Sequence, residues 1–275
     1  MFSPLPDPVH QQPKGTPSLN ARRAVGLLLI AMVAACGLLA PLIAPYDPFA
    51  SGIETLQNPS AAHWFGTDAL GRDVLSRVIY GARISLLVGA GASTVAALIG
   101  VPIGLVAGYF RGGIDLVLVQ VIDLFVAVPG LVLALIITAM MGATATNLAL
   151  ILGVVSSPTV ARLVRGQSMV VRAALYVEAA KAAGGGPAWI IGRHVWPNIM
   201  RTVAAQFATT VSYAIFTSAS LSFLGLGVPP PAADWGGMVR EGFPFLAILP
   251  LLSLGPGAAV ALTVMAFYLV GSSVE

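Results

Sequence analysis

Long apolar stretches with almost no charge are the feature that most restricts what this chain can fold into. Only 9% of the 275 residues are charged and 57% are hydrophobic, whereas a soluble domain carries about 25% charged residues. The bilayer must therefore solvate much of the chain, and stretches of roughly 20 apolar residues span it as helices. We expect an all-α polytopic membrane protein with six transmembrane helices, at residues 24–44, 84–109, 115–141, 147–164, 203–226 and 246–270.

The lysines and arginines orient these helices. With a cytoplasmic N-terminus, ten of the 14 lie in segments on the inside, as the positive-inside rule requires. We therefore expect both termini in the cytoplasm. The predicted division is a proline-rich, disordered cytoplasmic tail (1–20), a first transmembrane helix with its periplasmic loop (21–83) and a core of five transmembrane helices (84–275).

The first apolar stretch has two interpretations. Arg22 and Arg23 precede it, and Val33 to Cys36 resembles a lipoprotein cleavage site, so a signal peptide is one interpretation. The run continues past Cys36 to Ala44, which is longer than the apolar core of a signal peptide. We therefore favour a retained membrane anchor.

Glycines and carboxylates stand out within the apolar stretches. Gly100, Gly104 and Gly108 are four residues apart, so they share one helix face and predict a close contact with another helix. Asp115 and Asp123 also share one helix face. They could form a proton relay or cation site, or they could pair with arginines such as Arg111 or Arg162. We favour the pairing. Hydroxyls and amides could line a mildly polar path, at Gln120, Ser156, Ser157, Thr209, Thr210, Ser212, Thr217, Ser218 and Ser220.

The sequence offers no way to hold a nucleotide or a metal. A phosphate-binding loop needs Gly-Lys followed by Ser or Thr, but Lys14 follows a proline and Lys181 follows an alanine. The three histidines and the single cysteine are scattered, and the small net charge of +3 does not favour nucleic acid. We expect no cofactor in this chain and no enzymatic activity of its own.

The polar segment 165–201 is too long for a simple connection. Residues 172–183 have a strong helix pattern, which Gly184 to Gly186 and then Pro187 should end. A second short helix is expected from Trp189 to Val195. A short rigid helix at the cytoplasmic face is suited to docking in a groove of another protein, although it could also rest on lipid headgroups.

Segment 172–198 resembles the EAA loop of ABC importer permeases, on the strings EAAKAAGGG and IIGRHVWPN. In that family the loop supplies a coupling helix that sits in a cleft of the ATPase subunit. The resemblance implies a type I ABC importer permease with a cytoplasmic coupling helix. The residues expected to couple this chain to the ATPase are Tyr176, Glu178, Ala179, Ala180, Lys181, Gly184, Arg193, His194 and Pro197.

Two further segments narrow the resemblance. Residues 64–86, WFGTDALGRDVLSRVIYGARISL, and residues 221–238, LSFLGLGVPPPAADWGGM, are similar to the C-type permeases of dipeptide, oligopeptide and nickel importers. The chain departs from that family at Gln120, where an arginine is common, and at its C-terminal end. The resemblance implies contact with a periplasmic partner at Trp64, Gly66, Asp68, Arg72, Asp73, Pro230 and Trp235.

The resemblance also implies a complex in the bacterial inner membrane. The expected partners are a homologous B-type permease, two ABC ATPase subunits or one fused ATPase, an extracytoplasmic binding protein and membrane lipids. ATP and magnesium would be bound by the ATPases. Uptake of di- or oligopeptides is the expected function; the alternatives are a nickel or other small peptide-like solute, an ion-coupled secondary carrier, and an assembly factor.

Overall fold

The computed structural model describes residues 19–110 and 112–273, and this part of the chain is helical without a named β-strand. The all-α prediction is confirmed. Most of the predicted disordered tail, residues 1–18, lies outside the described residues, and Leu19 and Asn20 already belong to the first helix. The elements are α1 (Leu19–Leu38), α2 (Ala40–Ile43), α3 (Val74–Phe110), α4 (Gly113–Ala127), α5 (Gly130–Met141), α6 (Ala145–Arg172), α7 (Leu175–Ala182), α8 (Pro187–Ile190), the π-helical turn η1 (Ile191–Val195), α9 (Trp196–Phe223), α10 (Trp235–Gly242), the 3₁₀ turn η2 (Phe243–Phe245) and α11 (Leu251–Ser272).

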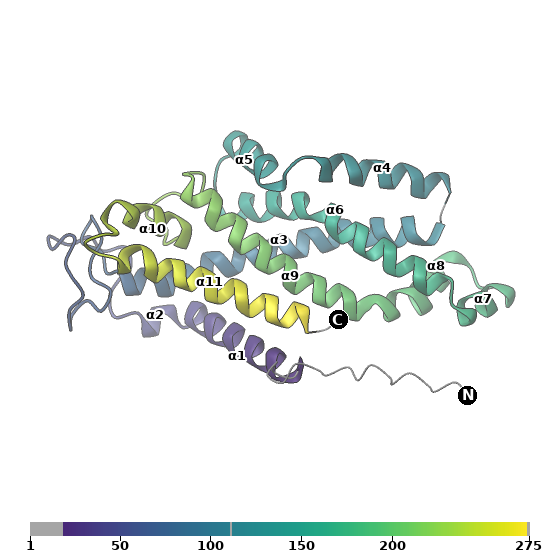
Figure 1. Ribbon diagram of the computed structural model, residues 1–275, viewed down its shortest axis with the longest axis horizontal. Helices are drawn as coiled ribbons and strands as arrows, with labels where there is room; N and C mark the ends of the chain where they lie inside the picture. Colours follow the sequence, from purple (N-terminus) through teal and green to yellow (C-terminus); the bar gives the residue numbers. More distant parts are fainter. Residues whose placement is uncertain (1–18, 111, 274–275) are drawn as a thin grey trace, which may run out of the picture.

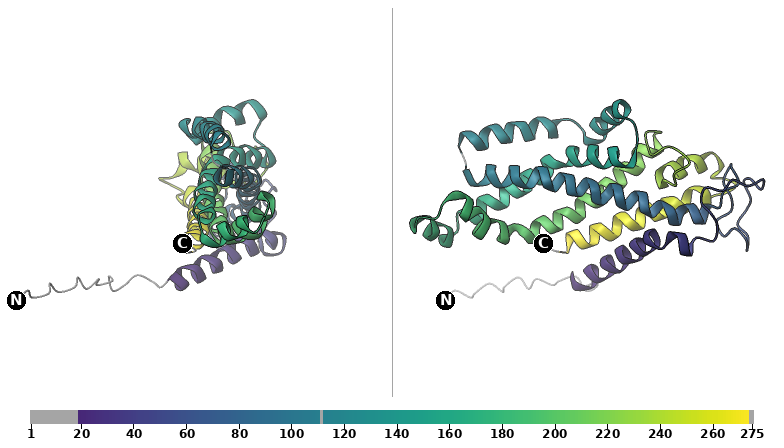
Figure 2. Two further views of the ribbon diagram at one scale, coloured as in Figure 1. Left: turned by 90° about the vertical axis from the view of Figure 1, so that its right-hand side faces the viewer. Right: turned by 180° about the vertical axis from the view of Figure 1, so that it is seen from behind.

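The long helices run side by side along one axis, with α1 and α4 at opposite edges of the bundle (Figures 1 and 2). One end of the bundle, which we name the loop end, carries residues 44–73 and 224–250. The other end, the α7 end, carries α7 and α8, and α1 begins and α11 ends on that side (Figure 1). The chain therefore alternates in direction from one long segment to the next.

Four of the described helices, α1, α3, α6 and α11, are long and apolar enough to span a membrane, and α4 with α5 would make a fifth span if the bent pair is counted as one. The remaining predicted span, 203–226, coincides with α9, which has 28 residues but many hydroxyl side chains that lower its hydropathy. The count of six spans stays a prediction.

Helix α3 begins ten residues before the predicted start at residue 84, so that prediction is wrong. Asp73 is the physical reason. Its carboxylate accepts hydrogen bonds from the backbone nitrogen and the hydroxyl of Ser76, at 2.8 and 2.7 Å, as a helix N-cap does. Residues 74–83 therefore extend the helix to the loop end.

The predicted continuous helix over 115–141 is also wrong, because it breaks between α4 and α5 with an 81° bend (Figure 1). Pro129 has no N–H for the helix ladder and disfavours helical torsions at the residue before it. Val128 accordingly has an extended backbone, with ψ 128°. The segment turns sideways near the middle of its length.

The boundaries of the following helices shift as well. Helix α6 continues to Arg172, well past the predicted end at residue 164. Helix α9 begins at Trp196 rather than 203, and Pro197 does not end the helix that precedes it. A proline in the first turn of a helix is tolerated because that N–H would have no partner in any case.

Helices α3 and α6 share the most extensive contact of any two described helices. A Cβ atom at Gly100, Gly104 or Gly108 would lie 2.5–2.6 Å from a backbone carbonyl oxygen of α6, at Ser157, Ala161 and Arg165 in turn. Only glycine lets the two backbones approach so closely. The three glycines therefore fix the line along which α6 follows α3.

Candidate functional site

Residues 173–195, which we name the α7 segment, project beyond the bundle at the α7 end (Figure 1). Helix α7 begins at Leu175, because Arg172, the predicted start, belongs to α6. Gly184 has a φ of +89°, and Gly185 donates a 3.0 Å backbone hydrogen bond to Ala180. This is the glycine-ended turn that the sequence predicts, and it folds α8 back beside α7.

The base of the α7 segment is part of the protein core. Val177, Ile190 and Val195 have no exposed surface and belong to one apolar cluster with Tyr109 of α3 and Ile199 of α9. The segment is thus held by several long helices rather than hanging as a loose loop. A displacement of α7 must move those helices with it, because packed interiors transmit strain.

Tyr109 also joins α3 to the end of α6 and to the last turn of α7. The guanidinium of Arg172 lies 5.6 Å from the centre of the Tyr109 ring, and the ammonium of Lys181 lies 5.5 Å from it. Both distances fall within the range of a cation–π contact. Sequence reasoning placed Lys181 at this site but missed Tyr109 and Arg172, since nothing in the local pattern links residues so far apart.

The outer face of the α7 segment is apolar and exposed. Leu175 is 82% exposed and Trp189 is 54% exposed. The ring of His194 lies 5.0 Å from that of Trp189 and 6.0 Å from that of Tyr176. Of the predicted coupling residues, the exposed ones are Tyr176, Glu178, Ala179, Gly184, Arg193 and Pro197, and the half-buried ones are Ala180, Lys181 and His194.

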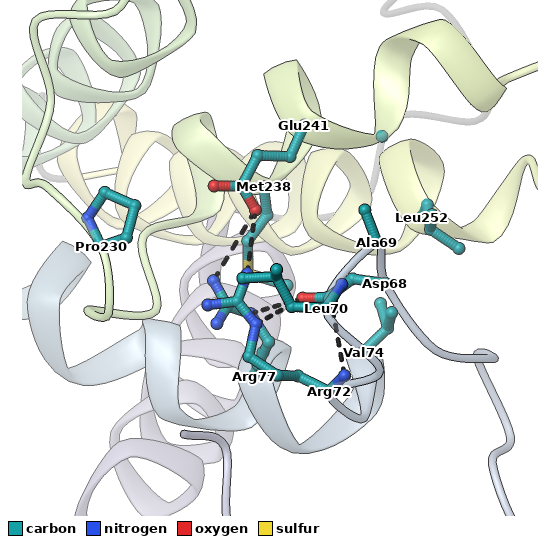
Figure 3. A pocket seen from close by; sticks show the side chains of 11 residues that line it. Asp68, Ala69, Leu70, Arg72, Val74, Arg77, Pro230, Met238, Glu241 and Leu252 are labelled. Carbon is teal, nitrogen blue, oxygen red and sulfur yellow. Dashed lines mark hydrogen bonds and ion pairs between the residues drawn. The ribbon is translucent and has the colours of Figure 1, made fainter. Parts of the chain in front are cut away.

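The loop end holds an ionic cluster in which Asp68, Arg72 and Arg77 are buried and Glu241 is half-buried (Figure 3). Arg72 Nε lies 2.7 Å from Asp68 Oδ2, and Arg77 Nε lies 3.6 Å from the same oxygen. Both guanidinium groups reach Glu241 of α10, at 3.4 and 3.9 Å. With Arg72 4% and Arg77 2% exposed, the cluster ties the loop to α3 and α10 in the interior.

Neighbouring residues fix the shape of the same loop. Asp73 Oδ1 lies 2.9 Å from His63 Nδ1. Gly66 has a φ of +77°, and a Cβ there would lie 2.3 Å from the carbonyl oxygen of Gln57, so only glycine fits. These residues support the loop from within.

The predicted contacts with a periplasmic partner are therefore divided between surface and interior. Trp64 is 67% exposed and Pro230 is exposed, so both can meet another protein. The other predicted residues, Gly66, Asp68, Arg72, Asp73 and Trp235, are buried. Sequence reasoning missed the cluster members Arg77 and Glu241; Arg77 lay in the similar segment 64–86, but Glu241 had no local signal.

The two carboxylates of α4 pair with α6. Asp115 accepts two hydrogen bonds from Arg165, at 2.5 and 2.7 Å, and Asp123 accepts one from Arg162 at 2.6 Å. The interpretation as arginine pairs agrees with this geometry. The pairs hold α4 beside α6 near the α7 end.

Comparison with known proteins identifies the family of this chain. Residues 100–274 match the family described as "Binding-protein-dependent transport system inner membrane component". The chain belongs to this family. It is a multi-pass inner membrane protein and the permease subunit of an ABC importer.

Among curated proteins, this permease is 37% identical over 254 residues to the glutathione transport system permease protein GsiD of Pectobacterium atrosepticum, covering 92% of this chain and 84% of the relative. GsiD of Escherichia coli O157:H7 is also 37% identical, over 90% of this chain and 82% of the relative. Among solved structures, the MetNI methionine ABC transporter in inward-facing conformations matches with a TM-score of 0.52 and 15% identity, over 67% of this chain and 95% of that chain. The last match supports the fold of the permease.

Proposed function

We propose that this permease imports small peptides across the bacterial inner membrane. The relatives at 37% identity are named for transport of glutathione, a peptide. The segments 64–86 and 221–238 independently resemble permeases of dipeptide and oligopeptide importers.

The energy is supplied by other subunits. The complex we propose contains a homologous B-type permease, two ABC ATPase subunits or one fused ATPase, and an extracytoplasmic binding protein. The ATPases bind ATP and magnesium. The α7 end and both chain termini face the cytoplasm, because most lysines and arginines then lie on the inside.

In this proposal the α7 segment couples ATP binding to the helix bundle. Its exposed apolar face, with Leu175 and Trp189, docks on an ATPase subunit. Closure of the ATPases displaces α7, and α3, α6 and α9 tilt with it. The observation that carries this step is the complete burial of Val177, Ile190 and Val195 among those helices, which makes the segment a rigid extension of the bundle.

The other candidates are weaker. An ion-coupled carrier is disfavoured because the family consists of binding-protein-dependent transport components. An assembly factor would need no buried coupling segment. A nickel or other small peptide-like solute stays the alternative cargo.

Reconstitution tests the proposal. Proteoliposomes containing the permease, its partner subunits and the binding protein should take up radiolabelled glutathione or dialanine when ATP is enclosed with the ATPases. Deletion of residues 172–186 should abolish uptake while membrane insertion continues. Uptake without ATPase subunits, or uptake of nickel but of neither peptide, would refute the proposal.

A further inference from the structure

A cavity of about 390 Å³, lined by both apolar and polar side chains, lies against the break between α4 and α5. Four segments line it. They are the last turn of α4, the break that follows it, α6 and α9. The first two contribute Phe125, Val126, Val128 and Gly130. Helix α6 contributes Val155, Ser156 and Thr159, and α9 contributes Gln206, Thr209, Thr210 and Tyr213. It is separate from the ionic cluster at the loop end and from the α7 segment.

The backbone gives a first reason to assign a role to this cavity. Val128 has an extended conformation near the middle of an apolar segment and is 40% exposed. Non-helical backbone at membrane depth is tolerated only where it is buried in protein or lines a hydrated cavity. The last carbonyl groups of α4 also lack partners within their own helix. The break therefore adds hydrogen-bond acceptors to the cavity wall.

A buried hydroxyl gives a second, independent reason. Ser156 is only 6% exposed, and within the described part of the chain its hydroxyl has no hydrogen-bond partner. A buried polar group without a partner is costly unless water or a ligand supplies one. Ser156 lines the cavity, and rotation of its hydroxyl toward the cavity lets a molecule inside supply that partner.

The opposite wall carries complementary groups. Thr209 and Thr210 donate their hydroxyl hydrogens to the carbonyl of Gln206, at 2.9 and 2.8 Å. The Thr209 oxygen is left as an acceptor, whereas the Thr210 oxygen already accepts a 3.3 Å hydrogen bond from the Gln206 amide nitrogen. Tyr213 brings its hydroxyl to the start of α5, since a Cβ at Gly130 would lie 3.0 Å from that oxygen. The Gln206 amide can both donate and accept.

The residues that line the cavity include neither charged side chains nor histidine or cysteine. Such a site cannot hold a bare transition-metal ion, which needs imidazole, thiolate or carboxylate ligands. Mixed neutral donors and acceptors instead match a peptide bond, which presents one N–H and one C=O.

From these observations we propose that the cavity binds the backbone amide groups of a peptide on its way through the membrane, with Ser156, Gln206 and Tyr213 as contact residues. This inference rests on the proposed peptide import and names the place of contact. Each lost hydrogen bond should weaken binding roughly two- to ten-fold.

The first test compares matched tyrosine variants in the reconstituted complex. Tyr213→Phe removes a hydroxyl from the cavity, whereas Tyr268→Phe removes one from an exposed site on α11. Tyr213→Phe and Ser156→Ala should raise KM for glutathione and dialanine, and Tyr268→Phe should not. ATPase activity without peptide should be equal in Tyr268→Phe and the wild type.

The second test needs no transport measurement. With the single native cysteine replaced by Cys36→Ala, Thr159→Cys places a thiol at the exposed edge of the cavity, and Ser220→Cys places one on α9 outside it. Binding protein loaded with dialanine, in the presence of ATP, should slow maleimide labelling at residue 159 but not at residue 220.

These experiments separate two failures. If the wild-type complex transports peptides while the cavity variants match Tyr268→Phe and residue 159 is not protected, the cavity assignment is wrong and peptide import stands. If the wild-type complex takes up neither peptide, the proposed function fails and the assignment fails with it. Raised KM with protection at residue 159 supports the assignment.

Discussion

The indole nitrogen of Trp235 donates a 2.8 Å hydrogen bond to the carbonyl oxygen of Val78, which fastens α10 across the first turns of α3. Trp235 is 2% exposed. The adjoining face of α3 carries Gly81, where a Cβ would lie 2.5 Å from the Trp235 ring. The loop end thus depends on a close fit between one tryptophan and one glycine.

Gly81→Ala should therefore destabilise the permease. The added methyl group must push Trp235 aside, and overpacking of this kind costs about 1–3 kcal/mol. Gly166→Ala on α6 is the matched control, because a Cβ there meets nothing within 4 Å. Thermal unfolding in detergent should show a lower Tm for Gly81→Ala alone; equal Tm values for both variants would contradict this fit.

Tyr109 should be needed for coupling through its ring rather than its hydroxyl. Its two cation–π contacts stabilise the α7 segment by about 1–2 kcal/mol together. Tyr109→Leu should increase hydrogen exchange over residues 173–186 and lower the amount of peptide imported per ATP hydrolysed. Tyr109→Phe keeps both contacts and should behave as wild type. Equal impairment of both variants would show that the cation–π contacts of the ring do not account for coupling.

The two arginine pairs should differ in strength. The side chains of Asp115 and Arg165 are 15% and 27% exposed, whereas those of Asp123 and Arg162 are 57% and 54% exposed. Asp115→Ala leaves a partly buried guanidinium without its bidentate partner and should cost about 2 kcal/mol. Asp123→Ala breaks an exposed pair and should change stability little.

Chemical unfolding of the two alanine variants side by side would measure this difference. A larger loss of stability for Asp123→Ala would contradict the conclusion that the Asp115–Arg165 pair is the stronger link between α4 and α6.

Burial raises the pKa of the Asp234 carboxyl above its ordinary value of 3.8, and the hydrogen bond from the Gly237 nitrogen opposes the shift. A carboxyl whose pKa is raised in the native state contributes stability below its unfolded pKa and loses that contribution as pH rises through the native pKa. Wild-type stability should thus fall as pH rises above 3.8, relative to an uncharged variant.

Asp234→Asn is that variant, because asparagine can still accept the 2.9 Å hydrogen bond from the Gly237 nitrogen that caps α10. Its Tm advantage over wild type should grow as pH rises above about 4 and level off once the pH exceeds the native pKa of Asp234. A difference in Tm that does not change with pH would contradict the shift.

Much of the fold could be predicted from local patterns. The apolar stretches located the long helices, and glycine spacing predicted a close contact of Gly100, Gly104 and Gly108 with another helix. The break at Pro129 and the N-cap at Asp73 also had local signals, since proline interrupts a helix and aspartate begins one. Both signals lie within or beside stretches whose continuous hydropathy masks them.

The rest could not be read from the sequence because it depends on distant residues. Arg72 and Glu241 are 169 positions apart, yet both belong to the ionic cluster at the loop end. Packing also fixes the helix that meets the glycine face, the rings that surround His194 and the hydroxyls that lie at the cavity. Of the nine hydroxyl or amide residues expected along a polar path, Ser156, Thr209 and Thr210 meet at the α4–α5 break.

The central claim is that the α7 segment faces the cytoplasm and docks on an ATPase subunit. Site-specific photo-crosslinking in the assembled transporter tests it most directly, with benzoylphenylalanine at Ala179 on exposed α7 and at Trp64 at the loop end. We predict that position 179 crosslinks to an ATPase subunit, and that position 64 crosslinks to the binding protein and never to an ATPase. A crosslink from position 179 to the binding protein, or from position 64 to an ATPase, would contradict the account.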